Sequence, residues 1–257
     1  MFAHVGILAY STFRETVRDR IFYLVAVFGF VMLAGTAVVS PLTVGAQGKI
    51  MTDMGLAAMT VFGLLVVVFV GSNMVRKEMD KGTILTILSK PVSRRQYLWG
   101  KFLGLSMTQI SMIAVMGVLF MLMTLLAPGD FSLRFVGAIY MGVLEMLLIT
   151  AVVVFFSTCV SPVLAAVFTL GTFAVGHLSE SIRDFGAMQG TVGQARVAEV
   201  VYYLVPNLEV FNVRGAVVHG ETVAPEHMLM ATLYALAYAG LLLLLAGNIF
   251  ARKELRG

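Results

Sequence analysis

The chain has 257 residues, of which 59% are hydrophobic and only 12% carry a charge. A soluble domain has about 25% charged residues, so this chain lacks the polar surface that a globule in water needs. The single cysteine, Cys159, excludes an internal disulfide and a multi-cysteine metal cluster. The net charge of +4 does not indicate nucleic-acid binding, because the basic residues gather beside apolar segments.

Six apolar segments predict an all-α membrane protein that folds as a single transmembrane domain over residues 1–257. A helix needs about 20 apolar residues to cross a bilayer, and each segment reaches or approaches that length. The predicted spans are residues 21–39, 54–75, 102–126, 136–160, 163–178 and 228–250. Only Ser161 and Pro162 separate the fourth span from the fifth, so these two spans should form a tight hairpin.

The basic residues predict which side of the membrane each loop faces. Thirteen of the eighteen Lys and Arg residues precede the first span, lie between the second and third spans, or follow the sixth. Loops rich in Lys and Arg stay in the cytoplasm, so this side is predicted to be cytoplasmic. An even number of spans then places both termini in the cytoplasm.

Residues 2–18 are predicted to form an amphipathic helix that lies in the membrane interface ahead of the first span. On a helical wheel the apolar residues gather on one side, which is assigned to the lipid: Phe2, Val5, Ala9, Phe13 and Val17. Polar residues, among them Arg14 and Glu15, gather on the opposite side, as in interfacial helices.

Residues 179–227 form a long external loop, and its apolar run favours a folded cap against the membrane. A helix is predicted over residues 194–204, where Pro206-Asn207 stops it. Pro225 is expected to open the last span, because the first turn of a helix tolerates proline.

The most informative segment is the predicted cytoplasmic loop over residues 76–101, RKEMDKGTILTILSKPVSRRQYLWGK. Charged residues flank a short amphipathic stretch, residues 83–88, and Ser93 is a suitable N-cap for the next helix. A short helix held between two spans can transmit force from a soluble partner. The alternative is a loop that only satisfies the charge rule, and physical reasoning alone leaves both open.

This segment resembles the signature of the permease subunits of type-two ABC exporters. The family pattern has an acidic residue, Gly-Thr, an apolar pair, Ser-x-Pro, Ser-Arg, an aromatic residue and Gly-Lys. Here these residues are Glu78, Gly82-Thr83, Leu85, Leu88, Ser89, Pro91, Ser93-Arg94, Tyr97 and Gly100-Lys101. The N-terminal helix, the six spans, the external Tyr203-Leu-Val-Pro206-Asn207 and the closing Phe250-x-Arg-Lys-Glu-Leu255 extend the resemblance over nearly the whole chain. The chain is most similar to the branch that contains the permease for nitrous-oxide reductase maturation, and no substrate is carried over from that branch.

The resemblance implies a permease subunit that exports an unidentified substrate across a bacterial inner membrane. It implies two copies of a separate ATPase subunit, which binds ATP and Mg²⁺, and a second permease copy, so that a homodimer forms in the lipid bilayer. No cofactor is expected on this chain, which also lacks a P-loop because Gly48-Lys49 is followed by Ile50 rather than Ser or Thr. The residues expected to couple to the ATPase subunit are Glu78, Gly82, Thr83, Ile84, Leu85, Leu88, Pro91 and Arg94.

Three features inside the predicted spans could carry chemistry. Glu145 lies near the middle of the fourth span, where an acid is costly, so it marks either a substrate or proton site or a packing residue at the dimer seam. Met112 and Met116 share one face of the third span and could ligate Cu(I), although soft packing is the commoner role of such residues. His177 and Glu180 are three positions apart, but a metal site there has little support, and no metal site is predicted.

Two other functions fit parts of the pattern. The same fold without transport would make a sensor or an immunity protein. An intramembrane enzyme would need several reactive side chains at membrane depth, whereas the predicted spans hold one acid, no Lys or Arg and no G-x-S-x-G motif. Transport therefore remains the leading prediction.

Overall fold

The computed structural model describes residues 2–18, 22–39, 47–80, 93–126, 132–189 and 192–252, and within these residues all regular structure is helical. The elements are α1 (Phe2–Arg18), α2 (Phe22–Val39), α3 (Gln47–Asp80), α5 (Arg94–Leu126), α6 (Arg134–Cys159), α7 (Pro162–Gln189), α8 (Val192–Leu204), the 3-10 helix η1 (Glu209–Phe211), α9 (Arg214–Val218) and α10 (Pro225–Arg252). The all-α prediction is therefore confirmed for the described part of the chain.

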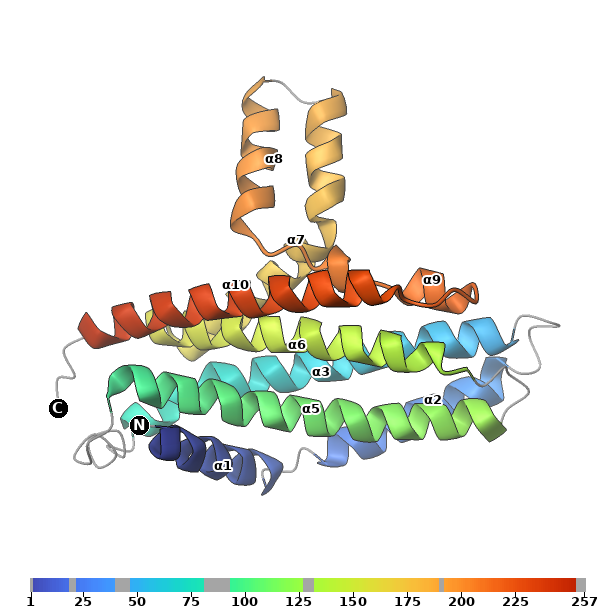
Figure 1. Ribbon diagram of the computed structural model, residues 1–257, viewed down its shortest axis with the longest axis horizontal. Coiled ribbons are helices and arrows are strands. Elements are labelled where there is room, and N and C mark those ends of the chain that lie inside the picture. The colour runs from blue at the N-terminus through green and yellow to red at the C-terminus, as the bar shows by residue number, and fades with distance from the viewer. Residues whose placement is uncertain are drawn as a thin grey trace.

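Four long helices, α3, α5, α6 and α10, run alongside one another and form the body of the molecule (Figure 1). Helix α6 packs against the other three and against α7, and its residues Leu148, Ile149 and Val153 are completely buried. Helix α1 lies on the opposite side of α5 from α6 in this view, and α2 contacts both α3 and α5. A polar side chain in the middle of α6 is therefore enclosed by neighbouring helices.

Five helices are long and apolar enough to cross a membrane, and they correspond to the second to sixth predicted spans. These helices comprise Gly48–Asn73, Arg94–Leu126, Arg134–Cys159, Pro162–Phe185 and Pro225–Arg252. The first predicted span falls on α2, whose apolar stretch Tyr23–Gly35 is shorter. The chain is thus a multi-pass membrane protein, and a sixth crossing by α2 stays a prediction.

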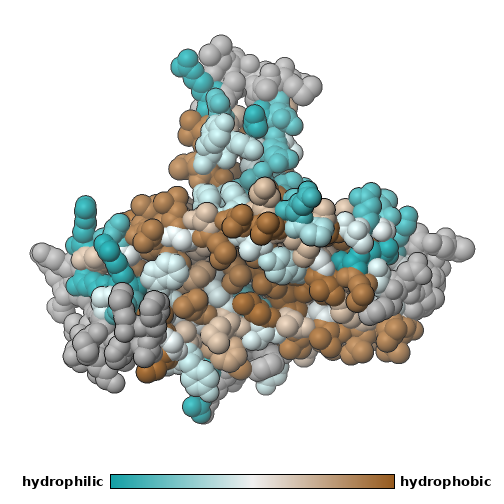
Figure 2. Space-filling view, in the orientation of Figure 1, coloured by the Kyte–Doolittle hydropathy of each residue, from teal (hydrophilic) through white to brown (hydrophobic). Residues whose placement is uncertain are grey.

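The two faces of α10 differ in a way that suits a helix surrounded partly by lipid. Small residues on one face are buried against the bundle, where they let helix backbones approach closely: Ala231, Ala235, Ala239 and Ala246. Large apolar residues on the other face stay exposed: Leu233, Leu236, Leu241, Leu244 and Leu245. Figure 2 shows such apolar side chains over the long helices, while hydrophilic ones gather near the ends of the body.

The turn between α6 and α7 is as short as predicted, because α6 ends at Cys159 and α7 begins at Pro162. Helix α7 does not end at residue 178, as the predicted fifth span does, but continues to Gln189. Neither proline nor glycine interrupts residues 177–185, so the sequence turns polar there without a signal that stops a helix.

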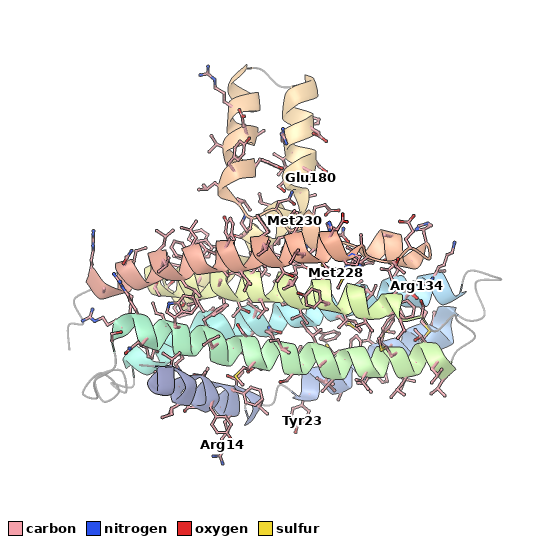
Figure 3. The ribbon with its side chains drawn as sticks, in the orientation of Figure 1. Arg14, Tyr23, Arg134, Glu180, Met228 and Met230 are labelled. Atoms are coloured by element: carbon pink, nitrogen blue, oxygen red, sulfur yellow. The ribbon has the colours of Figure 1, made fainter. Side chains whose placement is uncertain are left out.

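The second part of α7 and the whole of α8 form a helical hairpin that stands out from the body (Figure 1). The predicted external loop over residues 179–227 is therefore largely helical among its described residues. Helix α8 confirms the helix predicted over residues 194–204, and it ends before Pro206 as expected. Glu180 lies where the hairpin leaves the body (Figure 3).

Helix α1 packs on the first part of α5, and two glycines of α5 make this contact close. A Cβ atom at Gly100 would lie 2.7 Å from Cβ of Leu8, and a Cβ atom at Gly104 would lie 2.5 Å from Cβ of Thr12. Real Cβ atoms do not approach other atoms so closely, so α1 can occupy this place only because both residues are glycines.

The structure corrects the side of α1 that was assigned to lipid. Ala9 belongs to the predicted lipid side but is buried, together with Thr12 and Thr16. The large exposed residues of α1 are Ile7 and Tyr10, and Figure 3 shows Arg14 pointing away from the body. A helical wheel ranks positions by hydrophobicity, so it misses a tight contact made by alanine and threonine.

The cytoplasmic end of the molecule, as the charges predict it, brings four segments together. Helix α1, the end of α3, the start of α5 and the end of α10 all lie at this end of the body (Figure 1).

Helix α5 begins with a pair of reciprocal hydrogen bonds. The backbone N–H of Ser93 donates to Oε1 of Gln96 over 2.9 Å, and the N–H of Gln96 donates to Oγ of Ser93 over 3.3 Å. This reciprocal capping box confirms Ser93 as the N-cap of α5.

Candidate functional site

Glu145 is held on the central helix α6, where only 4% of the residue is exposed. The imidazole of His177 on α7 reaches it, and Nε2 donates a hydrogen bond to Oε1 of the carboxylate over 2.8 Å. The ring of Phe173, one turn earlier on α7, packs on the imidazole with ring centroids 4.7 Å apart. The hydrogen bond stabilises an acid that would be costly at this depth if it had no partner.

The α6–α7 turn explains why Glu145 and His177 meet. Glu145 lies sixteen positions before Ser161, and His177 lies sixteen positions after it (161 − 145 and 177 − 161). Two antiparallel helices with the same rise per residue bring positions equidistant from a tight turn to the same depth. The pairing was not predicted from the sequence, although symmetry about the predicted hairpin is the signal that identifies it.

A second acid, Glu209 of η1, approaches the other side of the imidazole, and its Oε2 lies 3.5 Å from Nδ1 of His177. Glu209 reaches this place because the chain after α8 is fastened to α7, where the N–H of Leu208 donates to O of Gly176 over 3.1 Å. A Cβ atom at Gly176 would lie 2.7 Å from both Cγ of Leu208 and O of Pro206. The close approach of this turn therefore requires glycine.

Asn207 fixes the same turn to two helices. Its backbone N–H donates to Oη of Tyr234 on α10 over 2.8 Å, and its Nδ2 donates to Oε1 of Glu180 on α7 over 2.9 Å. Its Oδ1 accepts a hydrogen bond from the N–H of Glu209 over 2.9 Å. The Pro206-Asn207 turn is thus the anchor that positions Glu209, and Glu180 takes part in this anchor.

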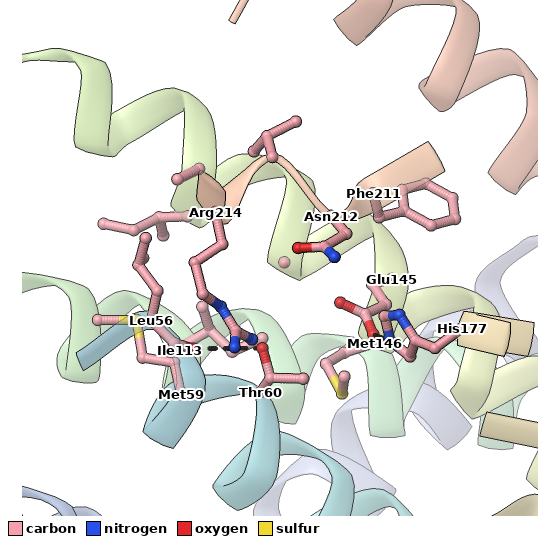
Figure 4. Close-up of a pocket in the computed structure, with 14 residues that line it drawn as sticks. Leu56, Met59, Thr60, Ile113, Glu145, Met146, His177, Phe211, Asn212 and Arg214 are labelled. Carbon is pink, nitrogen blue, oxygen red and sulfur yellow. Dashed lines mark hydrogen bonds and ion pairs between the residues drawn. The ribbon is translucent and has the colours of Figure 1, made fainter. Parts of the chain in front are cut away.

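A pocket that is partly open to solvent lies between these elements. Its walls are mainly apolar and come from α3, α5, α6 and η1: Leu56, Met59, Ile113, Ala138, Ile139, Met146 and Phe211. Its polar groups are few: Thr60, Glu145, His177, Asn212 and Arg214 (Figure 4). An apolar cavity with a small number of convergent polar groups is the usual form of a small-molecule site.

Arg214, at the start of α9, places a cation across the pocket from the acid and the imidazole. Figure 4 shows its side chain extending toward Thr60, while Glu145 and His177 lie on the other side. Its Nε lies 3.9 Å from Oδ1 of Asp53, whose side chain is 60% exposed. An exposed pair of this kind contributes about 0–1 kcal/mol, so the guanidinium retains most of its capacity to bind another anion.

The pocket is suited to binding a molecule rather than to breaking a bond. Thr60 provides the one hydroxyl group among the described residues that line it, and this hydroxyl donates to O of Leu56 over 3.2 Å. His177 is engaged with Glu145 and Glu209. An imidazole without a neighbouring nucleophile does not make the nucleophile–base pair that covalent catalysis needs.

The structure describes only part of the predicted coupling segment. Six of its residues lie outside the described part of the chain: Gly82, Thr83, Ile84, Leu85, Leu88 and Pro91. Glu78 lies in α3, close to its end. Arg94, at the start of α5, donates from Nη1 to O of Phe250 over 3.0 Å, which satisfies a carbonyl in the last turn of α10.

Two neighbours of Arg94 strengthen this junction between α5 and α10. Nη2 of Arg95 donates to Oδ1 of Asn248 over 2.7 Å. The ring of Tyr97 is buried and stacks on the ring of Phe250 with centroids 6.0 Å apart. The second half of the sequence motif, from Ser93 to Lys101, thus begins α5 and fastens it to the end of α10.

Met112 and Met116 are buried, with 4% and 0% of each residue exposed. They pack with Phe120 of the same helix and with Phe28 and Met32 of α2 in one apolar cluster. Packing among apolar side chains accounts for both methionines.

The sequence model of the ABC-2 family transporter proteins matches residues 7–255. The match includes both the junction and the pocket, and the chain belongs to this family. It is a permease of the ABC transporter class, a transport subunit rather than an enzyme, and such permeases normally work with an ABC ATPase subunit. No curated protein matches the sequence.

Proposed function

We propose that this chain is the permease of an ABC exporter and that it moves an amphipathic substrate through the pocket between α3, α5, α6 and α7. The working complex contains two permease copies and two ATPase subunits, and ATP and Mg²⁺ bind to the ATPase subunits. Six helices cross a bacterial inner membrane, and both termini lie in the cytoplasm.

The observation that carries this proposal is the continuity of α5, which links the coupling segment to the pocket. The helix is unbroken from Arg94, beside that segment, to Leu126, and Ile113 of the same helix lines the pocket. Nineteen residues separate Arg94 from Ile113 (113 − 94), so about 28 Å of helix connects them. A displacement at the start of α5 would therefore reach the wall of the pocket.

The start of α5 is fastened to two other helices at the same end of the body. Arg94 and Arg95 bond to the last turns of α10, while Gly100 and Gly104 allow α1 to pack closely. Helices α1, α5 and α10 are thus joined where an ATPase subunit would dock. A force on the coupling segment would move these three helices together.

The position of the pocket supports outward movement of the substrate. Phe211, Asn212 and Arg214 line it, and they belong to the segment between α8 and α10, which the charge distribution predicts to lie outside the cytoplasm. The junction of α5 with α10 lies at the opposite end of the body (Figure 1). A substrate in the pocket would therefore lie beside the predicted external segment and away from the junction of α5 with α10.

Purification of the tagged chain from native membranes tests the proposal. We expect an ABC ATPase subunit to co-purify in a ratio of one to one, with ATPase activity that disappears when this subunit is removed. Crosslinking in the same membranes should show a permease dimer. A chain that purifies without an ATPase subunit and crosslinks only as a monomer would contradict the proposal.

A further inference from the structure

The geometry points to a zwitterionic amphiphile as the ligand of the pocket. Its ammonium group binds Glu145, its carboxylate or phosphate binds Arg214, and its apolar chain lies on the apolar walls of the pocket. This inference rests on the proposed function, since it names the substrate class of the same pocket.

The first pole is the oxygen of Glu145 that His177 leaves free. His177 bonds to Oε1, whereas Oε2 has no hydrogen-bond partner among the described residues, and Figure 4 shows a carboxylate oxygen directed into the pocket. The side chain is 5% exposed, and this oxygen is available to accept a hydrogen bond from a molecule in the pocket. An ammonium group, which carries three donors and no acceptor, satisfies this oxygen.

The charges beside Glu145 favour a cation at this pole over a neutral donor. Two carboxylates, Glu145 and Glu209, flank the single imidazole of His177 at 2.8 Å and 3.5 Å. Two carboxyl groups thus share one imidazole, so a cationic donor suits this pole better than an anion. Opposite charges a few Å apart attract more strongly beside a buried group such as Glu145 than in bulk water.

The second pole is the guanidinium of Arg214. Its contact with Asp53, at 3.9 Å, is longer than a hydrogen bond, and Asp53 is itself well solvated. A guanidinium presents parallel N–H groups that match the two oxygens of a carboxylate or phosphate. This pole therefore accepts an anion without breaking a hydrogen bond to Asp53.

The walls of the pocket around the two poles are mainly apolar. Leu56, Met59 and Ile113 are almost completely buried and line the pocket near Arg214, while Met146 lines it beside Glu145 (Figure 4). A simple amine would satisfy Glu145 but face the guanidinium, and a simple acid would satisfy Arg214 but face two carboxylates. A molecule with both charges and an apolar body complements all three surfaces.

Protection of a cysteine at the pocket mouth tests this inference on the full chain, without the ATPase subunit. Asn212 lines the pocket and is exposed, so Asn212→Cys in a Cys159→Ser background is labelled with a polar maleimide in phosphatidylcholine nanodiscs. Three probes share an eight-carbon chain: N-octyl-β-alanine, octylamine and octanoate. The measured quantity is the probe concentration that halves the labelling rate.

We expect N-octyl-β-alanine to halve the rate at a concentration at least tenfold lower than either singly charged probe. Glu145→Gln should remove its advantage over octanoate, and Arg214→Gln should remove its advantage over octylamine. Glu226→Gln and Arg252→Gln, exposed charges outside the pocket, are the matched controls and should change nothing. Loss of one binding group should thus affect the zwitterion relative to only one of the two singly charged probes. A general loss of fold would instead weaken protection by all three probes equally.

The same protection assay with two lipids identifies the source of the zwitterion. Lysophosphatidylethanolamine carries an ammonium group and a phosphate, whereas lysophosphatidylglycerol carries the phosphate alone. Protection by the ethanolamine lipid, but not by N-octyl-β-alanine, assigns the site to a lipid headgroup, and the reverse assigns it to an amino-acid-like molecule. Equal protection by zwitterionic and singly charged probes, or no effect of Glu145→Gln and Arg214→Gln, overturns the inference. Either of these results leaves the co-purification test of the proposed function unaffected, so the two failures are distinguishable.

Discussion

Nε2 of His177 lies 2.8 Å from Oε1 of Glu145, although thirty-two positions separate the two residues in the chain. The bond joins α6, the most enclosed helix of the bundle, to α7, which continues into the projecting hairpin. It gives the buried acid a partner and leaves one carboxylate oxygen directed into the pocket. Packing and a binding role are therefore compatible at Glu145.

Removing the imidazole should cost more stability than neutralising the acid. His177→Phe leaves a buried carboxylate without its donor, which should lower the free energy of unfolding by about 1–3 kcal/mol. Glu145→Gln keeps an acceptor for the imidazole and should cost less, while Glu145→Lys should cost most because it buries a cation beside the imidazole. Thermal unfolding of the purified chain in detergent measures the order. A His177→Phe chain as stable as the unmodified one would show that the bond does not stabilise the fold.

Gly176 should tolerate no side chain, because a Cβ atom there would lie 2.7 Å from Cγ of Leu208 and O of Pro206. Gly176→Ala should destabilise the chain by about 1–3 kcal/mol and displace the turn that positions Glu209. Gly171→Ala on the same helix is the control: nothing lies within 4 Å of its Cβ atom, so it should be neutral or stabilising by up to about 1 kcal/mol. Thermal unfolding of the two variants, measured in parallel, tests this difference. Equal effects of the two substitutions on stability would contradict the close contact of Gly176 with Leu208 and Pro206.

Gly104→Ala should loosen α1 without unfolding the bundle. The new Cβ atom would lie 2.5 Å from Cβ of Thr12 and 2.7 Å from O of Ala9, so α1 must move away. We expect trypsin to cleave after Arg14 several times faster in this variant. Gly6→Ala in α1 meets nothing within 4 Å and should leave the cleavage rate unchanged. An unchanged rate in Gly104→Ala would show that α1 is not held by this contact.

Arg94→Ala should weaken coupling more than assembly. The substitution removes the hydrogen bond to O of Phe250 and with it part of the link between α5 and α10, but it leaves the apolar part of the coupling segment intact. We expect the ATPase subunit to co-purify as before, with substrate-stimulated ATPase activity reduced by half or more. Arg252→Ala, an exposed cation at the end of α10, is the control. Loss of the ATPase subunit itself would instead make Arg94 a docking residue.

Much of the architecture could be predicted from the sequence, because long apolar runs and proline positions act locally. The tight turn at Ser161-Pro162, the end of α8 before Pro206 and the N-cap at Ser93 all follow from such signals. The continuation of α7 beyond residue 178 could not be predicted in this way, because polarity ends a membrane span without ending a helix.

The candidate site was predicted only in part. Glu145 was identified because an acid inside an apolar run is conspicuous, but its partner His177 depends on how two helices align about their turn. Glu209 and Arg214 lie in short elements between α8 and α10, and the contacts of Asn207 with Glu180 and of Leu208 with Gly176 fasten this segment to α7. Such contacts are tertiary, and no local pattern in the sequence reveals them.

Substitutions in the proposed coupling segment, residues 76–101, test most directly whether this chain couples to an ATPase subunit. Leu85 has charged residues close on both sides in the sequence, so it should bury its side chain in a groove of the ATPase subunit, where a leucine contributes about 1.5–3 kcal/mol. Leu85→Asp should therefore reduce recovery of the ATPase subunit in a detergent pull-down by about tenfold or more. Size-exclusion chromatography should show the permease still dimeric, and the neighbouring polar change Thr86→Asp should have a smaller effect. Undiminished recovery with Leu85→Asp, and then with each other apolar residue of the segment, would contradict the coupling assignment.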